Sequence, residues 1–323
     1  MFRSRAVFAA STGIFVSALI FGAACRRDEI VFQPYASTVA ALTEDLKGLP
    51  EFQNKSLFNF KNLSKDTILE AAGGYKVHLS ETDLIFADAA GRAVPCSTCP
   101  DLTIEMETAP SSGAIIAKGL HTTDTSGQLL NAAGTLSFLA RCQGNSLMLQ
   151  PQKYIAVTGP DVLPVDRFFL YNAPVVSVGQ NFSGWNGTGQ EATIIQSSSN
   201  PSISGFQTEL RQTGWLGVCR FLNKPVKPFY VLLPAEYSAD NTKVYFVLKN
   251  QVAVAPMTFI SGQHFFRYDF APLDAEAQIV TVSKMQDGWH YARKDVILQH
   301  QSSVTIFPKA VSQSDLIKQL NVL

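Results

Sequence analysis

Two cysteines separated by two residues are the first place in the chain where residue type and spacing allow chemistry. Cys96-Ser97-Thr98-Cys99 lies between Pro95 and Pro100, so the turn that carries the thiols is stiff. The spacing suits a local disulfide, and it also suits a thiol–disulfide exchange site in which one thiol resolves the bond formed by the other. Half of a zinc site is the third alternative.

The residues around this motif favour the structural alternative. A zinc site needs four ligands, and no second Cys or His pair with similar spacing is found in the sequence. A redox Cys-x-x-Cys normally begins a helix, whereas Asp101 to Glu107 alternates like a strand. We therefore predict a disulfide between Cys96 and Cys99, with a thiol redox enzyme and a zinc site as the alternatives.

No other residues have the spacing of a catalytic or metal site. The five histidines show no H-x-x-x-H or H-E-x-x-H pattern, and we expect each to be a partly exposed polar residue in or beside a strand. A G-x-S-x-G elbow and a phosphate-binding glycine loop are also absent from the sequence. We expect no catalytic residue, no metal and no cofactor, with a metallohydrolase assembled from dispersed residues as the alternative. The histidines are His78, His121, His264, His290 and His300.

Trp185 is the candidate ligand contact. It stands in the glycine-rich segment Gly184-Trp185-Asn186-Gly187-Thr188-Gly189, which lacks the Lys and the helix of a phosphate loop. On an exposed loop its indole face would stack on a sugar ring or on a side chain of a partner protein. The alternative is a structural tryptophan that covers the seam between two domains, because large aromatic residues are mostly buried.

The N-terminus indicates export. Arg3 and Arg5 precede an apolar stretch from Ala6 to Phe21, and small residues follow before Cys25. This is the composition of a cleavable signal peptide. A membrane span requires about 20 uninterrupted apolar residues, and polar residues dilute this stretch. An ordinary signal peptide and an N-terminal membrane helix are the alternatives to cleavage directly before Cys25.

The segment Phe21-Gly22-Ala23-Ala24-Cys25 resembles the lipobox of bacterial lipoproteins, with Gly22 at the position where that pattern commonly has Leu. The resemblance implies that residues 1–24 are removed and that Cys25 becomes the lipidated first residue. It also implies an anchor in the outer membrane or at the cell surface. Four cysteines then remain, an even number that suits disulfides in an exported protein.

Composition sets limits on the partners. The chain has 26 basic and 26 acidic residues and no concentrated basic segment, which argues against nucleic acid as a partner. With 46% hydrophobic and 16% charged residues it is expected to fold rather than to be disordered.

The apolar pattern predicts a mainly β protein. Leu102, Ile104 and Met106 alternate with polar residues, which places one face of a strand in a core. Many such runs, separated by glycine-rich turns and without crossover helices, favour β-sandwiches. The other predicted strands are Tyr75 to Leu79, Asp83 to Ala87, Leu136 to Ala140, Leu147 to Gln150, Tyr154 to Thr158, Phe206 to Leu210, Phe229 to Leu233, Val244 to Leu248, Val252 to Ala255, Phe265 to Phe270, Ile279 to Ser283, Val296 to Gln299 and Val304 to Phe307.

We predict two β-sandwich domains with a short helix near each end. One helix covers Ser37 to Leu46, either docked on the fold or part of a loose tether, and the other runs through Leu316 and Leu320 with Ser312 or Ser314 as its cap. The predicted organisation is a signal peptide at 1–24, a tether with a short helix at 25–55, a first sandwich at 56–160, a connecting segment at 161–205 and a second sandwich at 206–323.

Two segments resemble a poorly characterised class of Gram-negative surface lipoproteins: Thr67 to Asp101, and Gly214-Trp215-Leu216-Gly217-Val218-Cys219-Arg220-Phe221. In the second, Gly217 and Cys219 replace the Asn and Asp of that class, so their polar roles do not carry over. The following aromatic strand and the Ala271-Pro272-Leu273 turn resemble a carboxypeptidase regulatory-like, transthyretin-like domain. The resemblance implies a surface protein without enzymatic activity.

These observations lead to one functional expectation. The protein is expected to be a lipid-anchored cell-envelope protein that acts as a non-catalytic binding or structural module. The alternative is a glycan- or protein-binding accessory of a surface uptake or adhesion system, and the less favoured class is a thiol redox or metal-dependent enzyme. Expected partners are the membrane, through the lipid on Cys25, and a glycan or another envelope protein.

Overall fold

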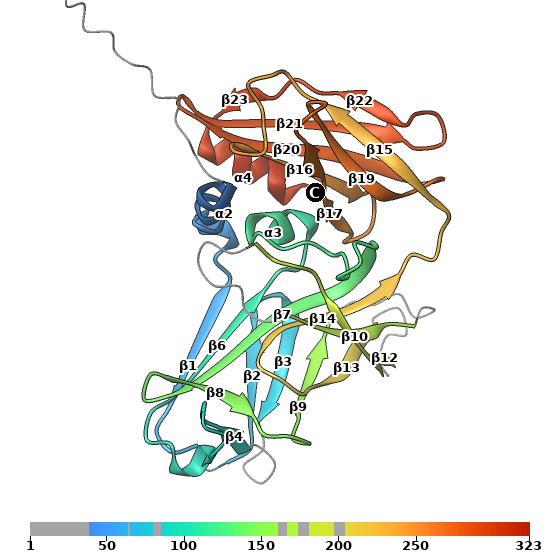
Figure 1. Ribbon diagram of the computed structural model, residues 1–323. Helices are drawn as coiled ribbons and strands as arrows, with labels where there is room; N and C mark the ends of the chain where they lie inside the picture. Colours follow the sequence, from blue (N-terminus) through green and yellow to red (C-terminus); the bar gives the residue numbers. More distant parts are fainter. Residues whose placement is uncertain (1–38, 64, 80–84, 161–166, 174–180, 197–203) are drawn as a thin grey trace, which may run out of the picture. The chain divides into compact units, whose positions relative to one another are not determined.

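The computed structural model describes residues 39–323 except 64, 80–84, 161–166, 174–180 and 197–203. Cys25 and the predicted signal peptide lie outside the described residues. The predicted fold class is confirmed: the described chain is mainly β, with several sheets and a short C-terminal helix (Figure 1). Among the described residues no helix is both long and apolar enough to span a membrane.

Two sheets enclose the first hydrophobic core. In the larger one the strand order is β11-β10-β14-β7-β8-β4-β5, with β6 pairing β7 and β1 pairing β6. The second has the order β12-β13-β9-β3-β2. Their strands are β1 Lys55–Phe60, β2 Thr67–Ala71, β3 Tyr75–Leu79, β4 Ile85–Ala87, β5 Ala93–Pro95, β6 Leu102–Thr108, β7 Leu130–Cys142, β8 Asn145–Leu149, β9 Ile155–Gly159, β10 Phe169–Ala173, β11 Asn186–Glu191, β12 Thr193–Gln196, β13 Ser204–Leu210 and β14 Gly214–Phe221.

The predicted alternation of β6 explains how it sits in this sandwich. Leu102, Ile104 and Met106 are fully buried, whereas the polar residues between them are half-buried. Phe138 of β7, paired with Met106, points into the same core. One face of each strand is therefore removed from water, as the period of two requires.

Two further sheets enclose a second core. Their orders are β18-β19-β15-β22 and β17-β16-β20-β21-β23, and β15 and β22 are paired in parallel. Phe229, Phe246 and Tyr268 lie in this core. The strands are β15 Val226–Leu232, β16 Thr242–Leu248, β17 Val254–Pro256, β18 Thr258–Ile260, β19 Phe265–Pro272, β20 Glu276–Met285, β21 Gly288–Ile297, β22 Ser303–Thr305 and β23 Lys309–Val311.

Three helices and the outer faces of two sheets form a third core (Figure 1). Leu42 and Leu46 of the first helix are fully buried there, so this helix is docked and is not part of a loose tether. Ser312 caps the last helix by accepting a hydrogen bond from the Asp315 N–H at 3.1 Å, as predicted. The helices are α2 Val39–Lys47, α3 Ser112–Ala117 and α4 Gln313–Asn321, and the 3₁₀ turns are η1 Pro50–Phe52, η2 Ala72–Gly74 and η3 Cys96–Thr98.

Helix α3 was not predicted, since the sequence indicated only one short helix near each end of the chain. Ser111 accepts a hydrogen bond from the Ala114 N–H at 3.2 Å and so begins the helix. Gly113 is required at the contact with α4, because a Cβ atom there would collide with the Leu320 carbonyl group. All six residues of α3 are buried, so an amphipathic period could not reveal it.

The predicted domain boundary at residue 206 does not coincide with the boundary that the strand pairing gives. Strand β13 pairs with β9, and β14 pairs with β7 and β10, so residues 204–221 belong to the first pair of sheets. Strands β10, β11 and β12 lie within the segment predicted as a connection. The second pair of sheets begins only at Val226. The short apolar runs of residues 161–205 gave too weak a period to show that they pair.

Candidate functional site

The predicted Cys96–Cys99 disulfide is wrong. Cys99 is bonded to Cys142, with the two Cα atoms 5.9 Å apart. The ladder between β6 and β7 places Leu102 opposite Cys142, which brings the end of β7 to the turn that holds Cys99. Long-range strand pairing, which local spacing does not report, therefore selects the partner.

Among the described residues two cysteines keep their thiols, Cys96 and Cys219, and both are buried. Loss of hydration raises the pKa of the Cys96 thiol to about 12, and burial also raises that of Cys219. A reactive cysteine needs a lowered pKa, because the thiolate is the nucleophile. Both side chains thus have the environment of structural cysteines.

Trp185 is not an exposed ligand contact, contrary to the prediction. Its side chain is 0% exposed, and its Nε1–H donates a hydrogen bond to the His121 carbonyl oxygen at 2.6 Å. Its ring meets that of Phe182 edge-on, with the centroids 5.2 Å apart. The position agrees with the alternative of a structural tryptophan, since Trp185 belongs to the core that also holds the helices.

His121 is buried, although the sequence analysis expected partly exposed histidines. Its Nε2 lies 3.0 Å from the Phe182 carbonyl oxygen, and its Nδ1 lies 2.8 Å from the Thr123 hydroxyl. Burial lowers the pKa of His121 to about 4, so the ring is neutral at physiological pH. Both ring nitrogens therefore hold neighbouring loops together.

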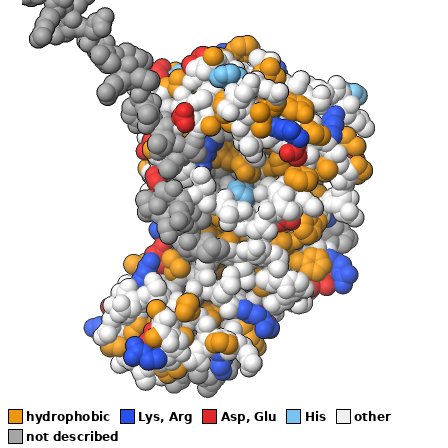
Figure 2. All heavy atoms as spheres, in the orientation of Figure 1, with side chains coloured by type: hydrophobic (Ala, Val, Ile, Leu, Met, Phe, Trp, Pro, Cys, Tyr) orange, Lys and Arg blue, Asp and Glu red, His pale blue; other side chains and the backbone are white. Residues whose placement is uncertain are grey.

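The other four histidines do not form a cluster with acidic residues in the described part of the chain. His78, His264 and His300 are exposed, whereas His290 is half-buried and contacts Asp287 at 2.9 Å. Within the described ranges no three His, Cys, Asp or Glu side chains form a set of metal ligands. On the face seen in Figure 2, basic and acidic side chains are interspersed rather than concentrated.

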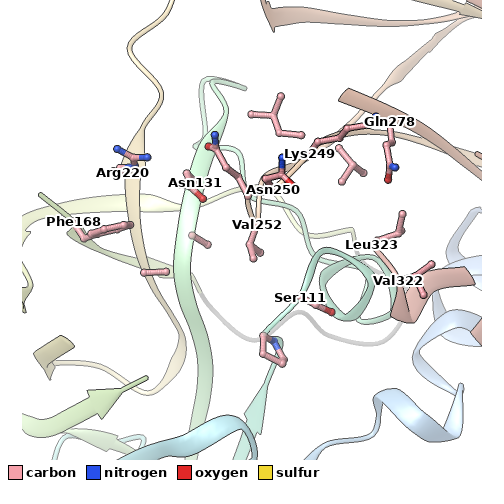
Figure 3. Close-up of a pocket in the computed structure, with 16 residues that line it drawn as sticks. Ser111, Asn131, Phe168, Arg220, Lys249, Asn250, Val252, Gln278, Val322 and Leu323 are labelled. Atoms are coloured by element: carbon pink, nitrogen blue, oxygen red, sulfur yellow. The ribbon is translucent and has the colours of Figure 1, made fainter. Parts of the chain in front are cut away.

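A cavity with a volume of about 770 Å³ lies between the two pairs of sheets (Figure 3). We call it the amide pocket. In Figure 3, Arg220 and Asn131 lie on one side, and Lys249 and Gln278 lie on the other. Its lining comes from β7, β14, the start of α3, the β16–β17 turn, β20 and the end of the chain: Pro110, Ser111, Asn131, Ala132, Ala133, Phe168, Arg220, Val247, Leu248, Lys249, Asn250, Gln251, Val252, Gln278, Val322 and Leu323.

The polar side chains that line the amide pocket are four amides, two cations and the Ser111 hydroxyl. Asn131 comes from β7, Asn250 and Gln251 from the turn after β16, and Gln278 from β20. Asn250 has φ +60°, a left-handed conformation that asparagine tolerates better than most residues, and this makes the turn tight. The described lining includes no Asp or Glu side chain.

The cations of the amide pocket are partly engaged within the protein. Lys249 Nζ lies 2.7 Å from Asp295 and 3.8 Å from Glu276, neither of which lines the pocket. The hydrogen bond with Asp295 raises the pKa of Lys249. The Arg220 guanidinium lies over the Phe168 ring, 5.8 Å from its centroid. Lys249 therefore supplies hydrogen-bond donors more than unneutralised charge.

One hydrogen-bond acceptor of a residue that lines the amide pocket has no partner. Gln251 Oε1 is buried and has no hydrogen-bond partner among the described residues. Buried polar atoms nearly always have a partner, so such an atom requires an explanation. The amide pocket was not predicted from the sequence. The only signal was the polar turn Lys249-Asn250-Gln251 between two apolar runs, which any hairpin would contain.

No family model, no curated protein and no solved structure matches the chain. The likeness to surface lipoproteins rests on the sequence motifs alone.

Proposed function

We propose that the protein is a non-catalytic binding module of the cell envelope and that the amide pocket binds a glycan fragment. The observation that carries this proposal is the convergence of four amide side chains from three separate elements in a cavity of about 770 Å³. A cavity of this size suits a ligand of a few sugar rings or smaller, since binding cavities commonly measure roughly 300–1,000 Å³.

The chemistry of the pocket favours hydroxyl groups. A side-chain amide both donates and accepts hydrogen bonds, as a sugar hydroxyl does, so neighbouring amides can pair with neighbouring hydroxyls. Gln251 lines the pocket, and its Oε1 has no partner in the described chain; because this oxygen is buried, the side chain must rotate to offer it to a ligand, while Lys249 adds donors. Because Asp295 neutralises Lys249, a phosphate would meet less positive charge than the two cations suggest.

A glycan array tests the proposal, with Asn131→Ala and Gln251→Ala combined as the pocket variant. We expect the wild type to retain at least one oligosaccharide and the double variant to lose it. Asn145→Ala is the matched control, because Asn145 is exposed and pairs with Cys142 at the opposite end of β7 from Asn131. Thermal unfolding of all three proteins shows whether the fold is kept. An array on which the wild type retains nothing contradicts the proposal.

We also propose that a lipid on Cys25 anchors the module in the outer membrane or at the cell surface. The support is the basic, apolar and small-residue succession before Cys25. An acyl chain inserts by burying methylene groups, and stable attachment takes more than one chain. A diacylated cysteine meets that requirement.

Metabolic labelling with a palmitate analogue tests the anchor. The wild-type protein is expected to take up the label and to fractionate with membranes, and Cys25→Ala is expected to lose both properties. An unlabelled wild type, or a Cys25→Ala protein that stays labelled and membrane-bound, would show that the anchor is wrong. Cys96→Ala is the control, since that thiol is buried.

A further inference from the structure

Lys243 has an unusual position for a lysine. It lies on β16, on the same side of the strand as Tyr245 and Val247, which belong to the core beneath the helices. Successive residues of a strand point to opposite faces, so the stem of Lys243 is directed toward that core. Its side chain is half-buried, whereas most lysines are exposed.

Lys243 lines a second cavity, of about 280 Å³. We call it the lysine pocket. Most of its wall is apolar, and the described residues that line it include no Asp or Glu. The lining consists of Gly119, Asn181, Phe182, Ala239, Thr242, Lys243, Val244, Tyr245, Pro256, Met257, Phe259 and Phe266.

The charges near Lys243 do not neutralise it. Within the described chain no carboxylate lies within 4 Å of its ammonium group. Glu44 of α2 attracts it from further away, but Glu44 is already paired with Lys47 at 2.9 Å. Lys47 repels it, and Lys284 on the adjacent strand lies against Asp45 at 4.0 Å.

Two other titratable groups lie near Lys243 and do not provide a negative charge. The neutral His121 ring is held by the Phe182 carbonyl and the Thr123 hydroxyl. Tyr245 is fully buried, and burial raises the pKa of its phenol, so it stays protonated. Neither group is arranged as a proton donor to a molecule in the lysine pocket.

The environment favours the neutral amine of Lys243. Loss of hydration is the main cause, and Lys47 adds repulsion; together they lower the pKa to about 8. At pH 8 about half of the Lys243 amines are then neutral, compared with less than about 1% for an ordinary lysine. Lysines that form Schiff bases are activated in the same way, by an apolar pocket or by a neighbouring cation.

We propose that Lys243 captures small aldehydes with a short apolar chain as an imine in the lysine pocket. The neutral Nζ attacks the carbonyl carbon to give a carbinolamine, and the nitrogen then forms a double bond to that carbon while the oxygen leaves as water. The water takes the carbonyl oxygen, and its two hydrogens correspond to the two hydrogens that the neutral amine loses through exchange with solvent, so the step balances without an oxidant or a reductant. At roughly 30 Å³ for each non-hydrogen atom, the share of one water molecule in the liquid, the volume of about 280 Å³ has room for about nine such atoms.

The proposed step is covalent binding and not turnover. No described acid or base is free to carry protons between Lys243 and a bound aldehyde, because His121 uses both ring nitrogens. The site is also separate from the amide pocket, with which it shares no lining residue. Failure of glycan binding would therefore leave this proposal untouched, and the reverse also holds.

The test is reductive trapping of hexanal by the mature protein with cyanoborohydride between pH 6 and 10, with alkylation at each lysine measured by peptide mass spectrometry. At pH 7 we expect Lys243 to react at least about ten-fold faster than the exposed Lys76 and Lys318, because a larger fraction of its amine is neutral. Its rate should level off above about pH 8, where most of its amine is neutral.

Three variants make the outcome specific. Lys243→Arg keeps the charge and should lose the adduct, and Phe259→Ala should reduce the preference for hexanal over acetaldehyde because the apolar wall is shortened. Lys47→Gln removes the repelling cation and frees Glu44, so it should raise the pKa of Lys243 and move the plateau to higher pH. If Lys243 in the folded wild type reacts no faster than Lys318, or if its rate has no plateau below pH 10, the proposal is wrong.

Discussion

Replacing Trp185 by alanine is expected to lower the free energy of unfolding by about 3–5 kcal/mol, the usual loss when a large aromatic side chain is removed from a core. The indole is 0% exposed and packs edge-on against Phe182. The variant also leaves the His121 carbonyl oxygen without the hydrogen bond it accepts from Nε1 at 2.6 Å. Urea unfolding, followed by fluorescence and circular dichroism, measures the loss.

Two controls separate packing from hydrogen bonding at Trp185. Trp185→Phe keeps most of the apolar volume and should lose roughly half as much stability or less. Tyr154→Ala removes an aromatic side chain that is 48% exposed, and its effect should stay within about 0.5 kcal/mol. A Trp185→Ala protein as stable as the wild type would show that the indole is on the surface, as the sequence first suggested.

Removing the disulfide is expected to have an effect of similar size. Cys99 and Cys142 are 43 residues apart in sequence, and closing a loop of this length restricts the unfolded chain by about 4 kcal/mol in the loop-entropy model. The double variant Cys99→Ala/Cys142→Ala should therefore unfold at a clearly lower urea concentration than the wild type. A reducing agent should lower the stability of the wild type but leave that of the double variant nearly unchanged.

Cys96→Ala is the matched control for the disulfide, because it removes a buried thiol from the same turn and keeps the Cys99–Cys142 bond. Cys96→Ala should lower the free energy of unfolding by less than half as much as the double variant does. The stability of the Cys96→Ala protein should still fall when a reducing agent is added. Peptide mapping without reduction identifies the pair directly. A peptide that links Cys96 to Cys99, or a Cys96→Ala protein that lacks a disulfide, would overturn the pairing.

The sequence predicted elements whose pattern is local. Strand β3 has the predicted bounds, Tyr75–Leu79. Gly73 and Gly74 precede its regular alternation, so two neighbouring signals agree. The mainly β class follows from many segments of this kind.

Other elements are defined by contacts between distant residues. Strand β14 has six consecutive buried residues, because one face meets the first core and the other meets the core under the helices. Such a strand shows no alternation. The glycines around Trp185 predicted an exposed loop. Trp185 instead forms a β-bridge with Asp124, and its side chain is buried. Local composition could not report this bridge.

The amide pocket and the lysine pocket could not be predicted from the sequence either. The amide pocket combines Asn131 with residues more than a hundred positions later, and none of its amides has a distinctive spacing. Lys243 precedes an apolar run that was predicted as a strand from Val244, so it looked like a residue at a strand end. Only the apolar pocket and the nearby Lys47 of α2 show that the surroundings of Lys243 favour a neutral amine.

Ligand binding in the amide pocket is the central proposal for this protein, and titration calorimetry tests this binding most directly. The oligosaccharide retained on the array is titrated into the wild type, into Asn131→Ala/Gln251→Ala and into Asn145→Ala. Loss of two amides that contact the ligand should weaken binding at least about ten-fold, since each hydrogen bond contributes roughly 0.5–1.5 kcal/mol. Asn145→Ala should bind like the wild type. Equal affinity in the wild type and the pocket variant, with both folded, would contradict the proposed binding site.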